Sequence, residues 1–494
     1  MAVFSLNAMD FFPLLHATHR INGIVTLISA SATASELESQ LRCSSAVALF
    51  TCAPLLQTAL RAARAVSIPD DSVFLLPVPG FDSASRLSTD GLIAEAETLP
   101  PVASPRWSEG QGARQTAYLC FSSGTSGLPK AVMISHRNVI ANILQLSTAE
   151  APSREALAFT TETVLGVLPF SHVFGLIVCG LLSQYRGDEV VVLPRWHLDS
   201  TLAAVQRHSI RRLLVVPPML VQMAAARERL SSTHHLSSVR WILSGAAPLG
   251  TELADKLLRL FPEGRLGQGY GLSESATAVT INSETENLVG SSGPLLPGMR
   301  AKLVDAAGER VTGYDQPGEL FLQSPSLALG YLDNEKATAE TFVWHDDGRW
   351  LRTGDEVLVR KSDSGRDHFF ITDRIKELIK VKGHQVAPAE LEAHLLGHPL
   401  VSDCAVIAAP DETSGEVPKA FVVKAEEATG TSDGDIIAAL GKHFRDHKAS
   451  YKALRGGVRF VDSIPKSPSG KILRRLLRDD EDAKMRSRVS PSKL

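Results

Sequence analysis

The chain has few cysteines and almost no excess charge of either sign. The cysteines are Cys43, Cys52, Cys120, Cys179 and Cys404. They form no C-x-x-C pair and no zinc-finger spacing, so we predict buried thiols in a reducing compartment. Lys and Arg number 51 against 54 acidic residues. A surface that coats nucleic acid is therefore not expected, although the charge balance leaves a local basic patch open.

Long apolar runs are also absent. The most apolar stretch, residues 165–182, contains Pro169, Ser171 and His172. A membrane span needs about 20 predominantly apolar residues, so we predict a buried strand, a turn and a helix here. No basic segment followed by a long apolar core opens the chain, which argues against a secretory signal. Apolar residues make up 44% and charged residues 21%, which excludes disorder, collagen and coiled coil.

Short apolar runs alternate with helical patterns along most of the chain. The alternation predicts an α/β domain of layered, largely parallel sheets, with strands at 46–50, 72–76, 190–193 and 213–216 and helices at 55–66 and 198–208. Short strands between turns predict a β-rich subdomain over 293–370. A smaller α+β module follows. We therefore place two domains at 1–372 and 373–494.

A loop of hydroxyl and glycine residues, SSGTSGLPK, spans 122–130. Its glycines allow close approach to a ligand, and its hydroxyls, backbone N–H groups and lysine suit phosphate oxygens. It is not a Walker A loop, because its glycines are too close together and Lys130 is followed by Ala131. On composition alone, a surface turn is an equally good interpretation.

Four later segments carry residue types that suit a nucleotide. Residues 267–274, GQGYGLSE, combine glycines with a tyrosine for a planar ligand and with Glu274, an oxygen ligand for Mg²⁺. Asp355 follows a tight turn and has two oxygens for ribose hydroxyls. Residues 373–385 are crowded with cations, and 464–471 present Lys471. Ordinary structural explanations exist for each: a glycine-rich turn, a turn-capping aspartate, a solvated basic face and an exposed loop lysine.

In this order, the five segments resemble the acyl-adenylate-forming enzymes, which include acyl-CoA synthetases, luciferases and adenylation domains of peptide synthetases. The resemblance runs from about Ala46 to Arg475, and 244–250 and 378–392 are most similar to 4-coumarate–CoA ligases and luciferases. It implies a large N-terminal domain and a small mobile C-terminal domain. It also implies an enzyme that uses ATP and Mg²⁺ to join a carboxylic acid to coenzyme A through an acyl-adenylate.

The resemblance implies roles for the matched residues. It assigns the β- and γ-phosphates to Ser122, Ser123, Gly124, Thr125, Ser126, Gly127 and Lys130. It implies that adenine is framed by Gln268, Gly269 and Tyr270, and that Ser273 reaches the phosphate region. Glu274 would bind Mg²⁺, and Asp355 would bind the ribose hydroxyls with help from Arg374. Lys471 would bridge the acyl carboxylate and the α-phosphate. After the C-terminal domain rotates about Asp373, Lys380 and Gln385 would approach the nucleotide and the acyl group. Lys382 and Gly383 would flank the coenzyme A channel, and Lys376 is a further cofactor-binding residue.

Histidines raise two further questions. His172 matches a position beside the acyl carboxylate, and without the resemblance a core histidine is the better interpretation. Phe174 and Ala246 are expected to line the acyl pocket. The pairs His394/His398 and His443/His447 have i,i+4 spacing, but the sequence places no third ligand, so a metal site is not expected there.

The chain departs from the family pattern at its N-terminus, and its segments leave alternative functions open. The phosphate loop begins closer to the N-terminus than in the family, so we expect an N-terminal domain shortened at its start, either naturally or because the recorded start is internal. An adenylating enzyme with a non-CoA acceptor and a non-catalytic nucleotide-binding relative are the alternatives. The final Ser492-Lys493-Leu494 predicts an import receptor and a peroxisomal location, in a fatty-acid or secondary-metabolite pathway. The sequence does not identify the acid.

Overall fold

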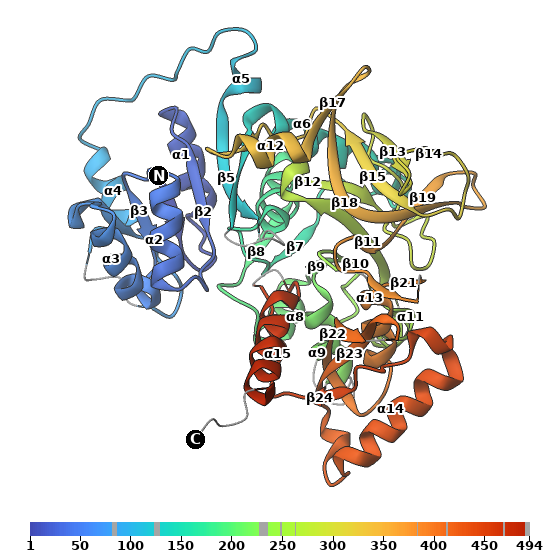
Figure 1. Ribbon diagram of the computed structural model, residues 1–494. Helices are drawn as coiled ribbons and strands as arrows, with labels where there is room; N and C mark the ends of the chain where they lie inside the picture. Colours follow the sequence, from blue (N-terminus) through green and yellow to red (C-terminus); the bar gives the residue numbers. More distant parts are fainter. Residues whose placement is uncertain are drawn as a thin grey trace.

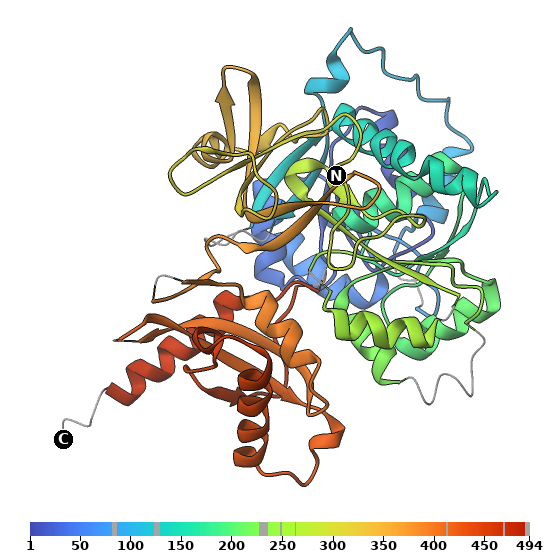
Figure 2. The same ribbon diagram turned by 90° about the vertical axis from the view of Figure 1, so that its right-hand side faces the viewer.

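The computed structural model describes residues 1–81, 86–122, 129–226, 236–247, 249–261, 263–382, 384–411, 413–467 and 470–489. Figure 1 shows a larger N-terminal part of sheets and helices, and a smaller C-terminal part in orange and red. Figure 2, turned by a right angle, shows the same C-terminal part at one end of the molecule.

The first sheet contains seven strands in the order β16-β6-β5-β2-β1-β3-β4. The strands from β4 to β5 pair in parallel, and β6 and β16 continue the sheet antiparallel. All four residues of β2 are buried, as expected for a strand covered on both faces. The bounds are β1 Ala2–Phe4, β2 Val25–Ile28, β3 Leu49–Thr51, β4 Val73–Leu75, β5 Thr116–Ser122, β6 Lys130–Ser135 and β16 Gly330–Tyr331.

The second sheet contains six strands in the order β12-β11-β10-β9-β7-β8. Its strands are parallel except for β12, which is antiparallel to β11 at the edge. The glycine-rich segment 267–274 therefore forms the end of β11 and the turn after it. The bounds are β7 Thr163–Gly166, β8 Glu189–Val192, β9 Arg212–Val215, β10 Trp241–Ser244, β11 Arg265–Leu272 and β12 Thr277–Ile281.

Helices cover these two sheets. Helix α6 begins after Ser135, whose hydroxyl accepts from the backbone N–H of Asn138 while the Asn138 side chain accepts from the N–H of Ser135. After β7 comes a turn and a buried π-helix, Phe174–Leu181, which confirms the predicted strand, turn and helix. The α-helices are α1 Phe11–Arg20, α2 Ala34–Cys43, α3 Leu56–Ala65, α4 Thr89–Ala96, α5 Gln111–Arg114, α6 His136–Ala156, α7 Leu182–Arg186, α8 Leu198–His208, α9 Pro217–Ala225, α11 Thr251–Leu260 and α12 Glu335–Thr341.

The third sheet is the predicted β-rich subdomain. Its order is β14-β13-β15-β18-β17, with β19 paired to β18. The pairing of β18 with β19 sets Asp355 opposite Arg374. The bounds are β13 Arg300–Val304, β14 Arg310–Val311, β15 Gly318–Gln323, β17 Phe342–His345, β18 Gly348–Lys361 and β19 Asp367–Arg374.

The C-terminal module has its own sheet and its own buried apolar clusters. The sheet order is β21-β20-β23-β22, with β24 paired to β23. Buried residues from Ile379 to Leu477 form the two clusters of this module, whereas the other two clusters contain residues no later than Phe369. The bounds are β20 Ile379–Val381, β21 His384–Val386, α13 Pro388–Leu396, β22 Val401–Asp411, β23 Gly415–Lys424, α14 Asp433–His447, β24 Val458–Phe460 and α15 Arg474–Val489.

The predicted fold class is confirmed, and one detail is wrong. All five cysteines are free, but only four are buried, because Cys43 is exposed at the end of α2. That helix buries Leu37 and Leu41, and Cys43 follows Leu41 by two residues, about 200° around the helix. Within the part of the chain that the structure describes, every helix is too short or too polar to cross a membrane.

Candidate active site

A tyrosine, a carboxylate and a guanidinium meet where the second and third sheets approach each other. The Tyr270 hydroxyl on β11 donates to Asp355 Oδ2 on β18 at 2.5 Å, and Arg374 Nε on β19 lies 3.6 Å from Asp355 Oδ1. Burial raises the pKa of Asp355, against the opposing effects of Arg374, the Tyr270 hydrogen bond and Lys471. Burial and the Asp355 charge raise the pKa of Tyr270 well above its usual value. This arrangement sets a buried carboxylate beside an aromatic ring.

Lys471 of the C-terminal module reaches the same group. The described ends of its loop lie close together, because the backbone N–H of Ser467 donates to the Lys471 carbonyl at 2.8 Å. Gly470 has a φ of +81°, which favours glycine, and a Cβ there would lie 3.0 Å from the Val216 side chain of the N-terminal part. Burial and Arg374 lower the pKa of Lys471 to about 8, while Asp355 opposes the shift. The lysine ammonium therefore lies in the field of Asp355 and Arg374.

His172 is also close enough to Lys471 to feel its charge. Burial lowers the pKa of His172 to about 4, and the charge of Lys471 contributes to the shift. The backbone N–H of Phe174 donates to Nδ1 of His172 at 3.3 Å. A Cβ at Gly245, directly after β10, would come within 2.8 Å of the Phe174 ring. The ring of Phe174 is thus packed on the backbone that follows β10, next to Ala246.

Glu274, Tyr331 and Lys130 form a second group. The Tyr331 hydroxyl on β16 donates to Glu274 Oε1 at 2.8 Å, and Lys130 Nζ lies 4.9 Å from the centre of the Tyr331 ring. Burial raises the pKa of Tyr331, as does the neighbouring Glu274 charge. Because the phenol stays protonated, it holds the carboxylate as a hydrogen-bond donor. A half-buried carboxylate fits Mg²⁺, which binds one or two protein carboxylates together with phosphates and water.

Other predicted nucleotide residues lie along the same strands. Gln268 Oε1 accepts from the backbone N–H of Leu249 at 2.8 Å, and Gly269 pairs with Ile281 across β11 and β12. Ser273 begins the short 3₁₀ turn that carries Glu274. Ser122 at the end of β5 pairs with Lys130 at the start of β6. The two described ends of the predicted phosphate loop are therefore held together by a strand pair.

Two family descriptions match this chain. The family described as AMP-binding enzyme matches residues 1–332, and the one described as AMP-binding enzyme C-terminal domain matches residues 390–471. The chain belongs to the AMP-binding enzyme family. This confirms the resemblance inferred from the five segments.

Relatives in this family agree on the enzyme class. An acyl-CoA ligase from Alternaria alternata, AFT1-1, is 41% identical over 99% of this chain and 84% of its own. A second acyl-CoA ligase from that fungus, AKT1, is also 41% identical, over 97% of this chain and 82% of its own. A 4-coumarate–CoA ligase-like protein from Arabidopsis thaliana is 36% identical over 94% of this chain and 79% of its own. The prediction of an AMP-forming acyl-CoA ligase is confirmed.

Solved structures of the AMP-binding enzyme fold superpose closely. An anthranilate CoA ligase in complex with anthranoyl-AMP has a TM-score of 0.82 and 24% identity, over 97% of this chain and 87% of its own. A MatB protein from Rhodopseudomonas palustris with bound ATP has a TM-score of 0.79 at 24% identity, over 97% and 88%. These likenesses confirm the fold.

Several predicted residues of this AMP-binding enzyme lie elsewhere. Lys380 and Gln385 face each other across the hairpin of β20 and β21, and their side chains are exposed. Lys382 and Lys376 are exposed as well. Among the described residues, no hydrogen bond or ion pair joins these four residues to Tyr270, Asp355 or Lys471. The predicted residues Ser123, Gly124, Thr125, Ser126, Gly127 and Gly383 lie outside the described residues.

Sequence reasoning missed two contributors. Tyr331 holds Glu274, yet it stands in a strand of two residues, which offers no periodicity to read. Asp373 accepts from the backbone N–H of Arg374 at 2.7 Å and from that of Ala389, in the first turn of α13, at 3.0 Å. Its expected role as a hinge gave no indication that its carboxylate joins β19 to the C-terminal module.

Proposed function

We propose that this acyl-CoA ligase works in two half-reactions around the cluster of Tyr270, Asp355, Arg374, Lys471 and His172. A carboxylic acid and ATP first give acyl-AMP and pyrophosphate, and the thiol of coenzyme A then displaces AMP. The observation that carries the proposal is the placement of Lys471, from a separate module, in the field of Asp355 and Arg374. Two anions must meet in the first step, so a mobile cation between them lowers the barrier.

In the first half-reaction, an oxygen of the substrate carboxylate attacks the α-phosphorus of ATP, and the bond to the β-phosphate oxygen breaks. Asp355 would accept hydrogen bonds from the ribose hydroxyls, and the Tyr270 ring would lie against the adenine. Lys471 would bridge the carboxylate and the α-phosphate where negative charge develops. Lysine suits this task because its compact charge sits on a flexible stem that can arrive and leave.

His172 would orient the acid rather than carry charge. With a pKa of about 4, its imidazole is neutral at pH 7. Its Nδ1 accepts from Phe174, so the proton of the neutral ring lies on Nε2. That N–H is a donor for the substrate carboxylate. Phe174 beside Gly245 would form the adjoining wall of the acyl pocket.

The phosphates would be held by Lys130, the loop that precedes it, Ser273 and Glu274. Glu274 would hold Mg²⁺, which when bound would neutralise charge on the phosphate oxygens. Tyr331 fixes the orientation of this carboxylate. Such outer partners of metal ligands commonly tune metal affinity.

The second half-reaction would follow rotation about Asp373. Rotation withdraws Lys471 and brings up the exposed face of β20 and β21, with Lys380 and Gln385 toward the nucleotide and acyl group. Lys382 and Gly383 would flank the coenzyme A channel, near Lys376. The hydrogen bond from Ala389 to Asp373 joins the parts that must move, so it would break on rotation.

The test is release of pyrophosphate with a panel of aryl, hydroxycinnamic and fatty acids, with and without coenzyme A. Thioester formation supports the proposal and identifies the acid. Adenylate that never transfers to coenzyme A would indicate another acceptor. Nucleotide binding without turnover of any acid would indicate a non-catalytic relative.

Tyr331→Phe should raise the Mg²⁺ concentration needed for ATP binding by roughly tenfold, because Glu274 loses its hydroxyl donor and its affinity for Mg²⁺ falls. ATP binding is measured by calorimetry at increasing Mg²⁺, and AMP binding without Mg²⁺ serves as the control that should not change. An unaltered Mg²⁺ requirement for ATP would contradict the role given to Tyr331.

We also propose import into peroxisomes through Ser492, Lys493 and Leu494, which lie outside the described residues. A fluorescent protein carrying the last residues of this chain should enter peroxisomes, and the same fusion without Leu494 should stay outside. Equal distribution of both fusions would contradict the proposal.

A further inference from the structure

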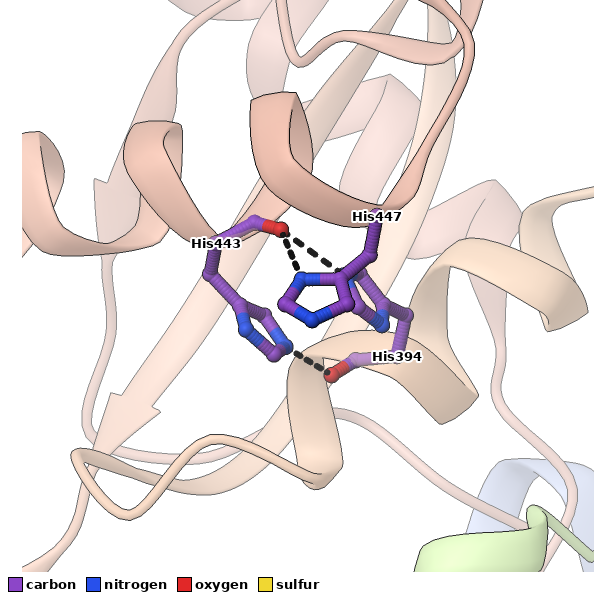
Figure 3. Close-up of side chains that lie close together, drawn as sticks. All are labelled: His394, His443 and His447. Carbon is purple, nitrogen blue, oxygen red and sulfur yellow. Dashed lines mark hydrogen bonds between the residues drawn. The ribbon is translucent and has the colours of Figure 1, made fainter.

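Histidines from two helices come together in the C-terminal module. His394 lies on α13, and His443 and His447 lie on α14. One candidate ligand atom from each lies within 4.8 Å of the others, and Figure 3 shows the three side chains between the helices. The ring centre of His398 lies 5.1 Å from that of His443. The packing of α13 against α14 thus supplies the third ligand that neither i,i+4 pair has alone.

Backbone carbonyls hold one nitrogen of each ring. His394 Nε2 and His447 Nδ1 lie 3.3 and 2.9 Å from the carbonyl oxygen of His443, and His443 Nε2 lies 3.2 Å from that of His394 (Figure 3). A carbonyl only accepts, so each of these nitrogens carries the proton. In the neutral ring the opposite nitrogen then carries the lone pair. Histidines that bind metals are typically held in this way, with one N–H on a carbonyl.

We propose that His394, His443 and His447 bind a divalent transition metal, for which Zn²⁺ is the reference ion. Imidazole suits Zn²⁺, Cu²⁺ and Ni²⁺, whereas Mg²⁺ and Ca²⁺ prefer the oxygen ligands that this set lacks. Three imidazoles and one water complete a tetrahedral zinc site, and His398 is the nearest further imidazole.

Binding requires one ring to turn. The rings of His394 and His443 are stacked, with centres 3.9 Å apart and planes 7° from parallel, so their lone pairs do not aim at one point. Ligand nitrogens of tetrahedral Zn²⁺ are about 3.4 Å apart, as follows from bonds of about 2.05 Å. Turning His443 gives up its hydrogen bond to the His394 carbonyl. His443 is half-buried and His447 exposed, so an ion can reach them from solvent.

A bound ion would join α13 to α14 and stabilise the C-terminal module. The test uses the full chain after removal of metals, titrated with Zn²⁺ by calorimetry without nucleotide. One Zn²⁺ ion per chain is expected, with a Tm that rises with Zn²⁺ concentration.

Variants separate this site from other histidines. His447→Gln changes an exposed side chain, so the fold should persist, and Zn²⁺ affinity should fall roughly tenfold or more. His443→Gln should have the same effect. His208→Gln, an exposed histidine at the end of α8, is the matched control and should bind Zn²⁺ like the parent chain. Binding that is absent from the parent chain, or unchanged in His447→Gln, would overturn the proposal.

Discussion

Lys471→Ala should lower the rate of adenylation by about 10²- to 10³-fold and leave thioester formation from preformed acyl-AMP nearly unchanged. Its ammonium lies in the field of Asp355 and Arg374, where negative charge would develop on the α-phosphate. After rotation of the C-terminal module this lysine would leave the site. The two half-reactions therefore depend on it to different extents.

The measurement separates the two steps. Pyrophosphate release reports adenylation, and synthetic acyl-AMP mixed with coenzyme A reports thioester formation. Lys442→Ala is the matched control, because it removes an exposed lysine from the same module. Both steps should survive that change. If Lys471→Ala slowed both steps by the same factor, the proposed division of labour would be wrong.

The sequence was sufficient to predict the segments that build the site, because each one carries its own local chemistry. Asp355 and Arg374 were both singled out, and the pairing of β18 with β19 brings them opposite each other. The approach of Lys471 to this pair depends on how two modules pack, which no local pattern records. Gly470 in the same loop lies close to Val216 of the N-terminal part, where an added Cβ would be 3.0 Å from the Val216 side chain.

Helical periodicity explains the remaining successes and misses. The spacing of His443 and His447 places both on one face of α14, but only packing reveals that His394 of α13 lies beside them. Cys43 was expected to be buried, yet the buried positions Leu37 and Leu41 already indicate that it lies off the inward face of α2. Tyr331 had no such signal, because a two-residue strand has no period.

Asp355→Asn should also greatly lower the catalytic efficiency of the enzyme with ATP. The substitution keeps the shape of the side chain and an oxygen that can accept from the Tyr270 hydroxyl. It removes the negative charge that would strengthen the hydrogen bonds from the ribose hydroxyls and that lies beside Arg374 and Lys471. Loss of charged hydrogen bonds should lower kcat/KM for ATP by about 10²-fold. Thermal unfolding of the variant serves as the control for its fold.

The same variant should shift the pH dependence of the reaction. The cationic form of Lys471 is the active one, and it is lost as pH rises through a pKa of about 8, so kcat/KM for ATP in the parent enzyme should fall above that pH. The charge of Asp355 raises the pKa of Lys471, so in Asp355→Asn the decline should begin at lower pH. Lys471→Arg keeps its charge over this range, so its residual activity should show no such decline. An alkaline decline that is identical in all three enzymes would show that another group titrates, and that Lys471 and Asp355 are not electrostatically coupled.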